Sequence, residues 1–422
     1  MDDNLTMNND KLNPRARNVA IGSLIAIMLT VGAYMTLPVF LVPFSQIIGV
    51  SIGEVAIMFS ATAICSMVVA LSFGTVLKKL GVKKICILAG IVQMIGYALM
   101  YLALVTRNVY LLYVGCGILA FATVAGGFAI AQTCITFWFV KRHGTVVSLI
   151  SVTNGVSVFI FAPLAGLAMQ RFEVTTLLLM IGFVFGGLVI LNAVLLLSEH
   201  PATYGMKPYG YVEVEKTADD GKPAAADNTL TKKQMISTAA FWLVLFATCL
   251  SSLANMGFRM NAAAYYQYIG VTALQSSFGI SIASIVGIGG ALLFGLLVDK
   301  KGPIFTVVLY SAIAAIGFGF ASVASGVAGM VIVAVLTGGI GVFSLLPALM
   351  LSRIFGAGNI GSVIGFGVVA GSLGSMIGSP TAGFIYTNLG TYVPFMFVAI
   401  ASLVLVVLCV VIAGRKKLAE TV

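Results

Sequence analysis

Apolar runs of about 20 residues recur along the whole chain and alternate with short polar turns. Each run is long enough to cross a hydrocarbon layer of roughly 30 Å as an α-helix. The pattern predicts twelve spans, at residues 19–44, 53–77, 85–105, 110–138, 145–169, 175–197, 240–264, 275–298, 304–323, 328–350, 361–387 and 393–413. Six precede one long polar stretch and six follow it. We therefore predict an all-α membrane protein with twelve transmembrane helices.

The polar stretch divides the chain into two halves. Residues 198–238 combine Pro, Gly, Ala and charged residues and cannot bury enough apolar surface to fold alone. The predicted organisation is a cytoplasmic tail (1–18), an N-terminal six-helix half (19–197), a cytoplasmic linker (198–238), a C-terminal six-helix half (239–414) and a second cytoplasmic tail (415–422). At 60% hydrophobic and 9% charged residues, the chain is far from a soluble domain, for which about 25% charged is usual.

Charge along the chain indicates its orientation. The net charge is +10, and most Lys and Arg residues lie at the termini, in the linker or in alternate turns, whereas Arg107 and Arg171 lie in the opposite turns. This positive-inside bias predicts a multi-pass protein of the cytoplasmic membrane with both termini in the cytoplasm. The same distribution argues against a nucleic-acid partner. The six cysteines all lie in apolar runs without close pairs, so no metal site, cofactor or disulfide framework is expected.

The two halves repeat each other. A pattern at the end of the second span recurs 221 positions later, at the end of the eighth: Gly74, Lys78, Lys79 and Gly81 correspond to Gly295, Asp299, Lys300 and Gly302. The same offset pairs Ser51 and Glu54 with Thr272 and Gln275. Each pair has the spacing of a capping box, which starts a helix. The repeat predicts two parallel, pseudo-symmetric six-helix halves related by an axis along the membrane normal.

These motifs resemble the major facilitator superfamily of transporters. The superfamily's loop signature after the second helix is matched by Gly74, Lys79, Gly81, Lys83 and Lys84, whereas Lys78 stands where an Asp is usual. The resemblance implies that the halves rock about a central cavity lined by helices one, four, seven and ten. It also implies that the two signature copies take part in conformational gating.

Further motifs resemble one branch of that superfamily, the oxalate/formate antiporters and monocarboxylate transporters. They are the Pro and Gly run from Pro201 to Gly210, the aromatic run 137–139 before a basic turn, Phe241-Trp242, and the segment 352–356. In that branch, oxalate exchange is attributed to an Arg in helix eight and a Lys in helix eleven. Neither predicted helix contains a basic residue here, so a substrate with two carboxylates is disfavoured.

Arg259 is the one charged residue deep within a predicted helix. An Arg at the centre of a membrane helix costs about 2.5–3.5 kcal/mol even on insertion scales, so we expect it to face the cavity and bind a substrate carboxylate. The alternative is that it snorkels to the outer interface. Ser251 and Asn255 precede it at helical spacing and share its face, which favours the binding role.

Other candidate substrate-binding residues are Tyr34 in helix one, Gln132 in helix four and Asn154 in helix five. The repeat offset places Tyr34 opposite Asn255. Each of these side chains could instead bond neighbouring helices together. The cluster Tyr265, Tyr266 and Tyr268 is interpreted as an interfacial belt, and the serine stripes of helices eight and eleven as close helix packing.

The function expected from these features is secondary active transport of a small organic anion, a monocarboxylate, by alternating access. No Asp or Glu lies within a span except Glu54 at its cap position, so exchange or movement with a proton on the substrate is expected. The alternative is transport of an amphipathic or neutral solute, with Arg259 structural. No convergent catalytic set is present, so an enzyme is not expected. The lipid bilayer is the expected environment, and the monomer the expected functional unit.

Overall fold

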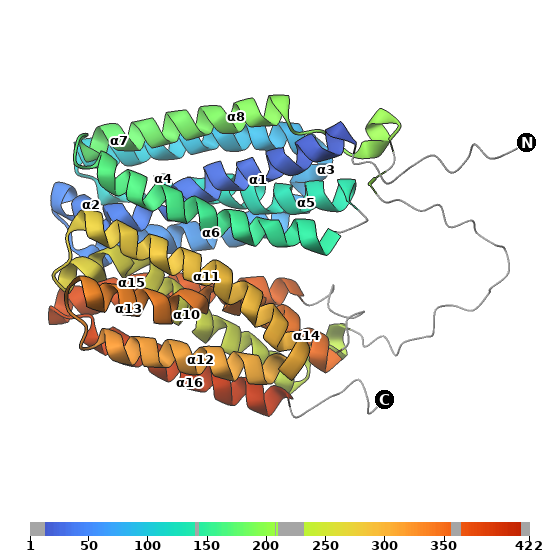
Figure 1. Cartoon of the computed structure of the whole chain (residues 1–422). Coiled ribbons are helices and arrows are strands. Elements are labelled where there is room, and N and C mark those ends of the chain that lie inside the picture. The colour runs from blue at the N-terminus through green and yellow to red at the C-terminus, as the bar shows by residue number, and fades with distance from the viewer. Residues whose placement is uncertain (1–12, 140–142, 207, 210–231, 356–363, 415–422) are drawn as a thin grey trace, which may run out of the picture.

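The computed structural model describes residues 13–139, 143–206, 208–209, 232–355 and 364–414. The tails, most of the predicted linker and the turn residues Lys141, Arg142 and Gly361 lie outside the described residues. The described chain is almost entirely helical, as Figure 1 shows.

The N-terminal half contains α1 (Pro14–Met35), η1 (Leu37–Phe40), α2 (Leu41–Ile48), α3 (Ile52–Thr106), α4 (Val109–Thr123), η2 (Val124–Ala129), α5 (Ile130–Trp138), α6 (His143–Ala168), α7 (Val174–Met180), η3 (Ile181–Phe185) and α8 (Gly186–Leu195). The segments η2 and η3 are π-helical turns, and α4 to α5 and α7 to α8 each form one continuous span.

The C-terminal half follows the short elements η4 (Pro201–Tyr204) and α9 (Lys232–Ile236). It contains α10 (Ala239–Tyr268), α11 (Ala273–Lys301), α12 (Pro303–Ala321), α13 (Gly326–Gly338), η5 (Gly339–Leu345), α14 (Leu346–Phe355), α15 (Ile364–Leu389) and α16 (Val393–Gly414). The two halves lie side by side, with both termini at one end of the bundle (Figure 1). We call this the terminal end, and the opposite end the distal end.

Helix α3 accounts for the difference between the 11 long apolar helices of the described chain and the twelve predicted spans. Within the described residues, 11 helices are long and apolar enough to cross a membrane. One of them is α3, with 55 residues, whose backbone leaves helical geometry at Gly81 (φ 74°, ψ 173°). A helix of that length would reach roughly 80 Å at 1.5 Å per residue, far more than one membrane requires. Gly81 therefore separates two crossings, and the twelve-helix prediction is confirmed.

Local geometry confirms the internal repeat. Ser51 with Glu54 forms a complete capping box at the start of α3, and Thr272 with Gln275 forms the equivalent box at the start of α11. Gly302 takes nearly the same backbone geometry as Gly81, at φ 82° and ψ 163°. A left-handed φ favours glycine, which has no Cβ, so both signature glycines are required by the turn that follows their helix.

The start of the predicted linker packs onto the N-terminal half. The Glu199 carboxylate accepts the backbone N–H groups of Val82 at 2.9 Å and Lys83 at 3.0 Å, and so caps the helix that restarts after Gly81. The Trp138 indole donates to the Glu199 carbonyl, and Arg15 lies over the Tyr204 ring at 4.7 Å. Helix α1 also begins at Pro14, before the boundary expected at residue 19, because Asn13 caps it.

Replacing Glu199 with alanine is expected to lower the free energy of unfolding by about 1 kcal/mol, the usual loss when a helix loses its N-terminal cap. Two N–H groups would lose their acceptor, whereas Glu199→Gln keeps one acceptor oxygen and is expected to have a smaller effect. Thermal unfolding in detergent measures both. An unchanged melting temperature in Glu199→Ala would contradict this role.

Close contacts between the halves lie towards the distal end. A Cβ on Gly383 of α15 would lie 2.8 Å from the Cα of Gly53 in α3, and the Gly53 N–H donates to Thr387. Ser281 of α11 donates to the Phe159 carbonyl of α6.

At the opposite, terminal end, one glycine of each signature copy has open space around it. Cβ atoms on Gly74 and Gly295 would meet no heavy atom within 4 Å. In Figure 1, the ribbons of α6 and α11 move apart towards the terminal end. The contacts described between the halves therefore lie distally, whereas Gly74 and Gly295 have free space around them at the terminal end.

Candidate functional site

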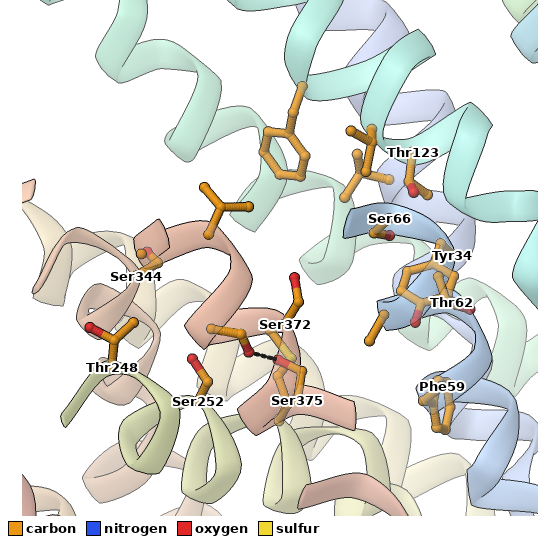
Figure 2. A pocket seen from close by; sticks show the side chains of 18 of the residues that line it. Tyr34, Phe59, Thr62, Ser66, Thr123, Thr248, Ser252, Ser344, Ser372 and Ser375 are labelled. Atoms are coloured by element: carbon orange, nitrogen blue, oxygen red, sulfur yellow. Dashed lines mark hydrogen bonds between the residues drawn. The ribbon is translucent and has the colours of Figure 1, made fainter. Parts of the chain in front are cut away.

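A cavity of about 510 Å³ lies between the two halves. Its walls come from α1, α3, α4 and η2 on one side and from α10, η5, α14 and α15 on the other. Figure 2 shows its polar lining, which consists of hydroxyl groups: those of Tyr34, Thr62, Ser66, Thr248, Ser252 and Ser372 are examples. None of its lining residues is charged. We call this cavity the central lobe. Its chemistry suits an apolar body that carries few polar groups.

A second cavity, of about 470 Å³, adjoins the central lobe at Phe128 and Ser344, which line both. It lies between α6 and α11 and is lined by Arg259, Ser151 and Asn154 among others. Arg259 is the only charged residue among its lining residues. We call this cavity the arginine lobe.

Arg259 has no counterion in the described part of the chain. No carboxylate, carbonyl or hydroxyl there is within bonding distance of its guanidinium. The side chain is half-buried and borders the arginine lobe, so it does not snorkel to a surface. Asn154, on the α6 wall, has a buried side-chain oxygen without a partner. Together the two place five guanidinium donors and one free amide around the same space.

A small niche of about 40 Å³ lies on the other side of Arg259, within the C-terminal half. It shares Arg259, Ala283, Ser284 and Gly338 with the arginine lobe. Asn255 and Tyr266 also line it, and they are 7% and 1% exposed. The niche thus extends the arginine lobe towards buried residues of the C-terminal half.

The structure brings together some of the predicted binding residues. Arg259 and Asn255 line the niche, Arg259 and Asn154 line the arginine lobe, and Tyr34 lines the central lobe. Tyr34 also packs edge-on against Phe59, with ring centroids 6.3 Å apart.

Ser251 and Gln132 lie outside these cavities. Ser251 is fully buried and donates to the Thr248 carbonyl at 2.9 Å. Gln132 is exposed, one helical turn beyond Phe128 towards the terminal end. Gln132 shares a helix face with Phe128, which lines both lobes, but it does not line either of them.

Sequence reasoning missed Tyr266. Tyr265 and Tyr266 are each 1% exposed, so they are not an interfacial belt, and only Tyr268, at 41%, remains exposed. The Tyr265 hydroxyl donates to the Ala321 carbonyl at 2.7 Å, whereas Tyr266 lines the niche. The helical spacing contained a signal, because residues 255, 259 and 266 fall within about 40° of one another at 100° per residue.

The predicted gating residues lie at the terminal end. Gly74, Lys78, Lys79, Gly295, Asp299 and Lys300 are all exposed. In the described part of the chain, Lys78 and Asp299 form no ion pair. These side chains are therefore free to meet partners when the terminal end closes, as gating would require, and their role stays a prediction.

Comparisons with known proteins agree with this architecture. The chain is 24% identical over 384 residues to the oxalate:formate antiporter of Oxalobacter formigenes, covering 88% of this chain and 85% of that protein. It is 24% identical over 327 residues to monocarboxylate transporter 13 of Rattus norvegicus, covering 76% and 71%.

Among solved structures, the nucleoside transporter NupG matches with a TM-score of 0.67 at 14% identity, over 96% of this chain and 99% of that one. A bacterial homologue of the human lysosomal transporter Spinster, in an inward-facing and unoccupied conformation, matches with a TM-score of 0.69 at 15% identity, over 97% and 98%. Residues 22–366 match the Major Facilitator Superfamily, and the chain belongs to this family of membrane transporters.

Proposed function

We propose that this transporter carries a small organic anion, a monocarboxylate with an apolar or aromatic body, by alternating access. The observation that carries the proposal is Arg259, an unpaired guanidinium at the wall of the arginine lobe. Its planar fork matches a carboxylate through two parallel hydrogen bonds. A bound carboxylate would neutralise a charge that is costly to hold without a partner in a membrane protein.

The size and lining of the adjoining cavities support the class of substrate. The carboxylate would lie in the arginine lobe, and the rest of the molecule would extend past Phe128 into the central lobe, which is lined by apolar groups and hydroxyls. One guanidinium balances one carboxylate, so a monocarboxylate fits better than a dicarboxylate. The relatives named as an oxalate:formate antiporter and a monocarboxylate transporter support the same class.

The residues that line the cavities indicate how substrate transport would be coupled to a proton or to a second anion. No Asp or Glu lines either lobe or the niche. The transporter therefore offers no carboxylate there to take up a proton for coupling. We propose that it exchanges one anion for another or moves the substrate together with a proton.

The proposal is tested by thermal stabilisation of the purified protein with matched pairs of a monocarboxylate and its neutral amide. A ligand that binds the folded state stabilises it by mass action. We expect stabilisation by at least one monocarboxylate and a much smaller effect of the amide of the same shape. Equal stabilisation by acid and amide would favour the alternative, an amphipathic or neutral solute held by the central lobe.

We also propose that the terminal end faces the cytoplasm, in keeping with its basic residues. A cysteine replacing Arg107, in a distal turn, is expected to react with a membrane-impermeant maleimide in intact cells. A cysteine replacing Lys301, at the terminal end, is expected to react only after the membrane is permeabilised. Both side chains are exposed. The reverse labelling pattern would invert the proposed orientation.

A further inference from the structure

The niche beside Arg259 contains hydrogen-bond donors that are not needed to bind the apolar body of a substrate. Three polar side chains of α10 line it: Asn255, Arg259 and Tyr266. None of them bonds another group in the described part of the chain. The Asn255 side-chain oxygen is enclosed without a partner, whereas its amide NH₂ is not enclosed in this way. The donor end of the amide is therefore the end that can reach a guest.

Charge and hydrogen-bonding capacity in the niche favour an anion. The guanidinium is positive and only donates, and the Asn amide and the Tyr hydroxyl both offer N–H or O–H groups. The hydroxyls of Ser284 and Thr337 also line the niche, but they donate to the Ile280 and Val333 carbonyls of their own helices. No carboxylate lines the niche to repel an anion. A cation would be repelled there by the positive charge of the Arg259 guanidinium.

The volume restricts the guest to a few atoms. A water molecule needs about 10–15 Å³ of such volume, so 40 Å³ admits a halide ion or a group the size of a carboxylate. A larger organic anion would not fit as a whole. The niche joins the arginine lobe at Arg259 and Ser284, which gives a small anion a way in.

We propose that the Asn255, Arg259 and Tyr266 niche binds one small monovalent anionic group. The free ion would be a halide, held in the unloaded transporter as a counterion for Arg259. A carboxylate of formate size offers the same chemistry and would occupy the same place. The proposal does not depend on which substrate is carried, because it concerns a site within the C-terminal half and is tested without transport.

The experiment compares thermal unfolding of the full-length protein in sodium bromide, sodium formate and sodium gluconate at equal ionic strength. We expect saturable stabilisation by bromide that gluconate does not produce. Tyr266→Phe keeps the ring that packs against Phe258, with centroids 6.4 Å apart, and loses only the hydroxyl. It is expected to weaken the apparent affinity for bromide by roughly tenfold, as does the loss of one hydrogen bond to a charged group.

The matched control is Tyr265→Phe, the neighbouring tyrosine. Its hydroxyl bonds the Ala321 carbonyl outside the niche, so this variant is expected to melt earlier than the wild type but to keep the same bromide affinity. Stabilisation by bromide alone identifies a free inorganic ion as the guest. Stabilisation by formate as well identifies the niche as a place for a carboxylate too.

Two outcomes would overturn the proposal. The first is that bromide and formate stabilise no more than gluconate. The second is an equal bromide response in wild type, Tyr266→Phe and Tyr265→Phe. If Tyr266→Phe were too unstable to measure, crystals soaked in bromide would decide, because the anomalous peak must lie between Arg259 and Tyr266.

Discussion

Replacing Arg259 with alanine is expected to lower the affinity for the proposed carboxylate substrate by roughly 10- to 150-fold. Hydrogen bonds to a charged group contribute about 1.5–3 kcal/mol, and each 1.4 kcal/mol is tenfold in a binding constant. Arg259→Lys keeps the charge but loses the planar fork, so it is expected to fall between alanine and wild type. Uptake into proteoliposomes and ligand-induced thermal stabilisation measure the two effects.

Thermal stability separates a binding role for Arg259 from a structural one. Since the guanidinium has no partner among the described residues, its removal breaks no bond of the fold and relieves the cost of a charge within the membrane. Arg259→Ala is therefore expected to melt no earlier than the wild type while losing transport. A structural arginine would show the opposite, with earlier melting and little change in ligand affinity.

Arg171→Ala is the matched control for this loss of a positive charge. Arg171 is exposed in the turn between α6 and α7 at the distal end, away from the lobes, and its replacement is expected to leave uptake unchanged. Unaltered carboxylate affinity in Arg259→Ala would refute the anion proposal and favour an amphipathic solute carried in the central lobe. An equal loss in both variants would indicate a general effect of charge rather than a bond at the site.

Local signals in the sequence predicted the fold well. The capping boxes at Ser51 and Thr272 depend on residues three positions apart, and the two signature glycines depend on backbone geometry at one residue each. Such features are determined by neighbours in the chain, so the spans and the repeat followed from the sequence. Long-range packing was harder: the cap that Glu199 supplies to Val82 joins residues 117 positions apart, and no local pattern marks it.

The same distinction applies to the site. Helical spacing correctly grouped Asn255 with Arg259, but it also included Ser251, which lies about 80° around the helix from Arg259 and is buried. Tyr266 was assigned to the membrane interface because tyrosines near helix ends often lie there. Its burial depends on contact with α11, where a Cβ on Gly279 would lie 2.8 Å from the Tyr266 ring, and the sequence of α10 alone does not contain that information.

Two leucine substitutions are expected to shift the transporter in opposite directions. Gly383→Leu would place a side chain against the Gly53 backbone, where even a Cβ would lie 2.8 Å from the Cα, and so prevent distal closure. Gly74→Leu meets open space in the present state, but would obstruct closure of the terminal end. Overpacking costs about 1–3 kcal/mol, which changes the ratio of two states by roughly 5- to 150-fold.

Spin-label distances across the two ends measure these shifts. One pair of labels replaces Leu80 and Lys301 at the terminal end, and a second replaces Thr106 and Asn388 at the distal end; all four positions are exposed. Gly383→Leu is expected to lengthen the distal distance and shorten the terminal one, and Gly74→Leu to hold the distances of the present state. Both variants are expected to lose uptake, because alternating access needs each end to close in turn.

The comparison of Gly383→Leu with Gly74→Leu is informative because the same change is made at both glycines and only its location differs. A general defect of folding would lower thermal stability in both variants without opposite changes in distance. If Gly74→Leu shortened the terminal distance as readily as the wild type does, the signature glycines would not take part in gating. If Gly383→Leu left the distal end closed, the α3 and α15 contact would not be the distal gate, and the approach of α6 to α11 at Ser281 and Phe159 would take that role.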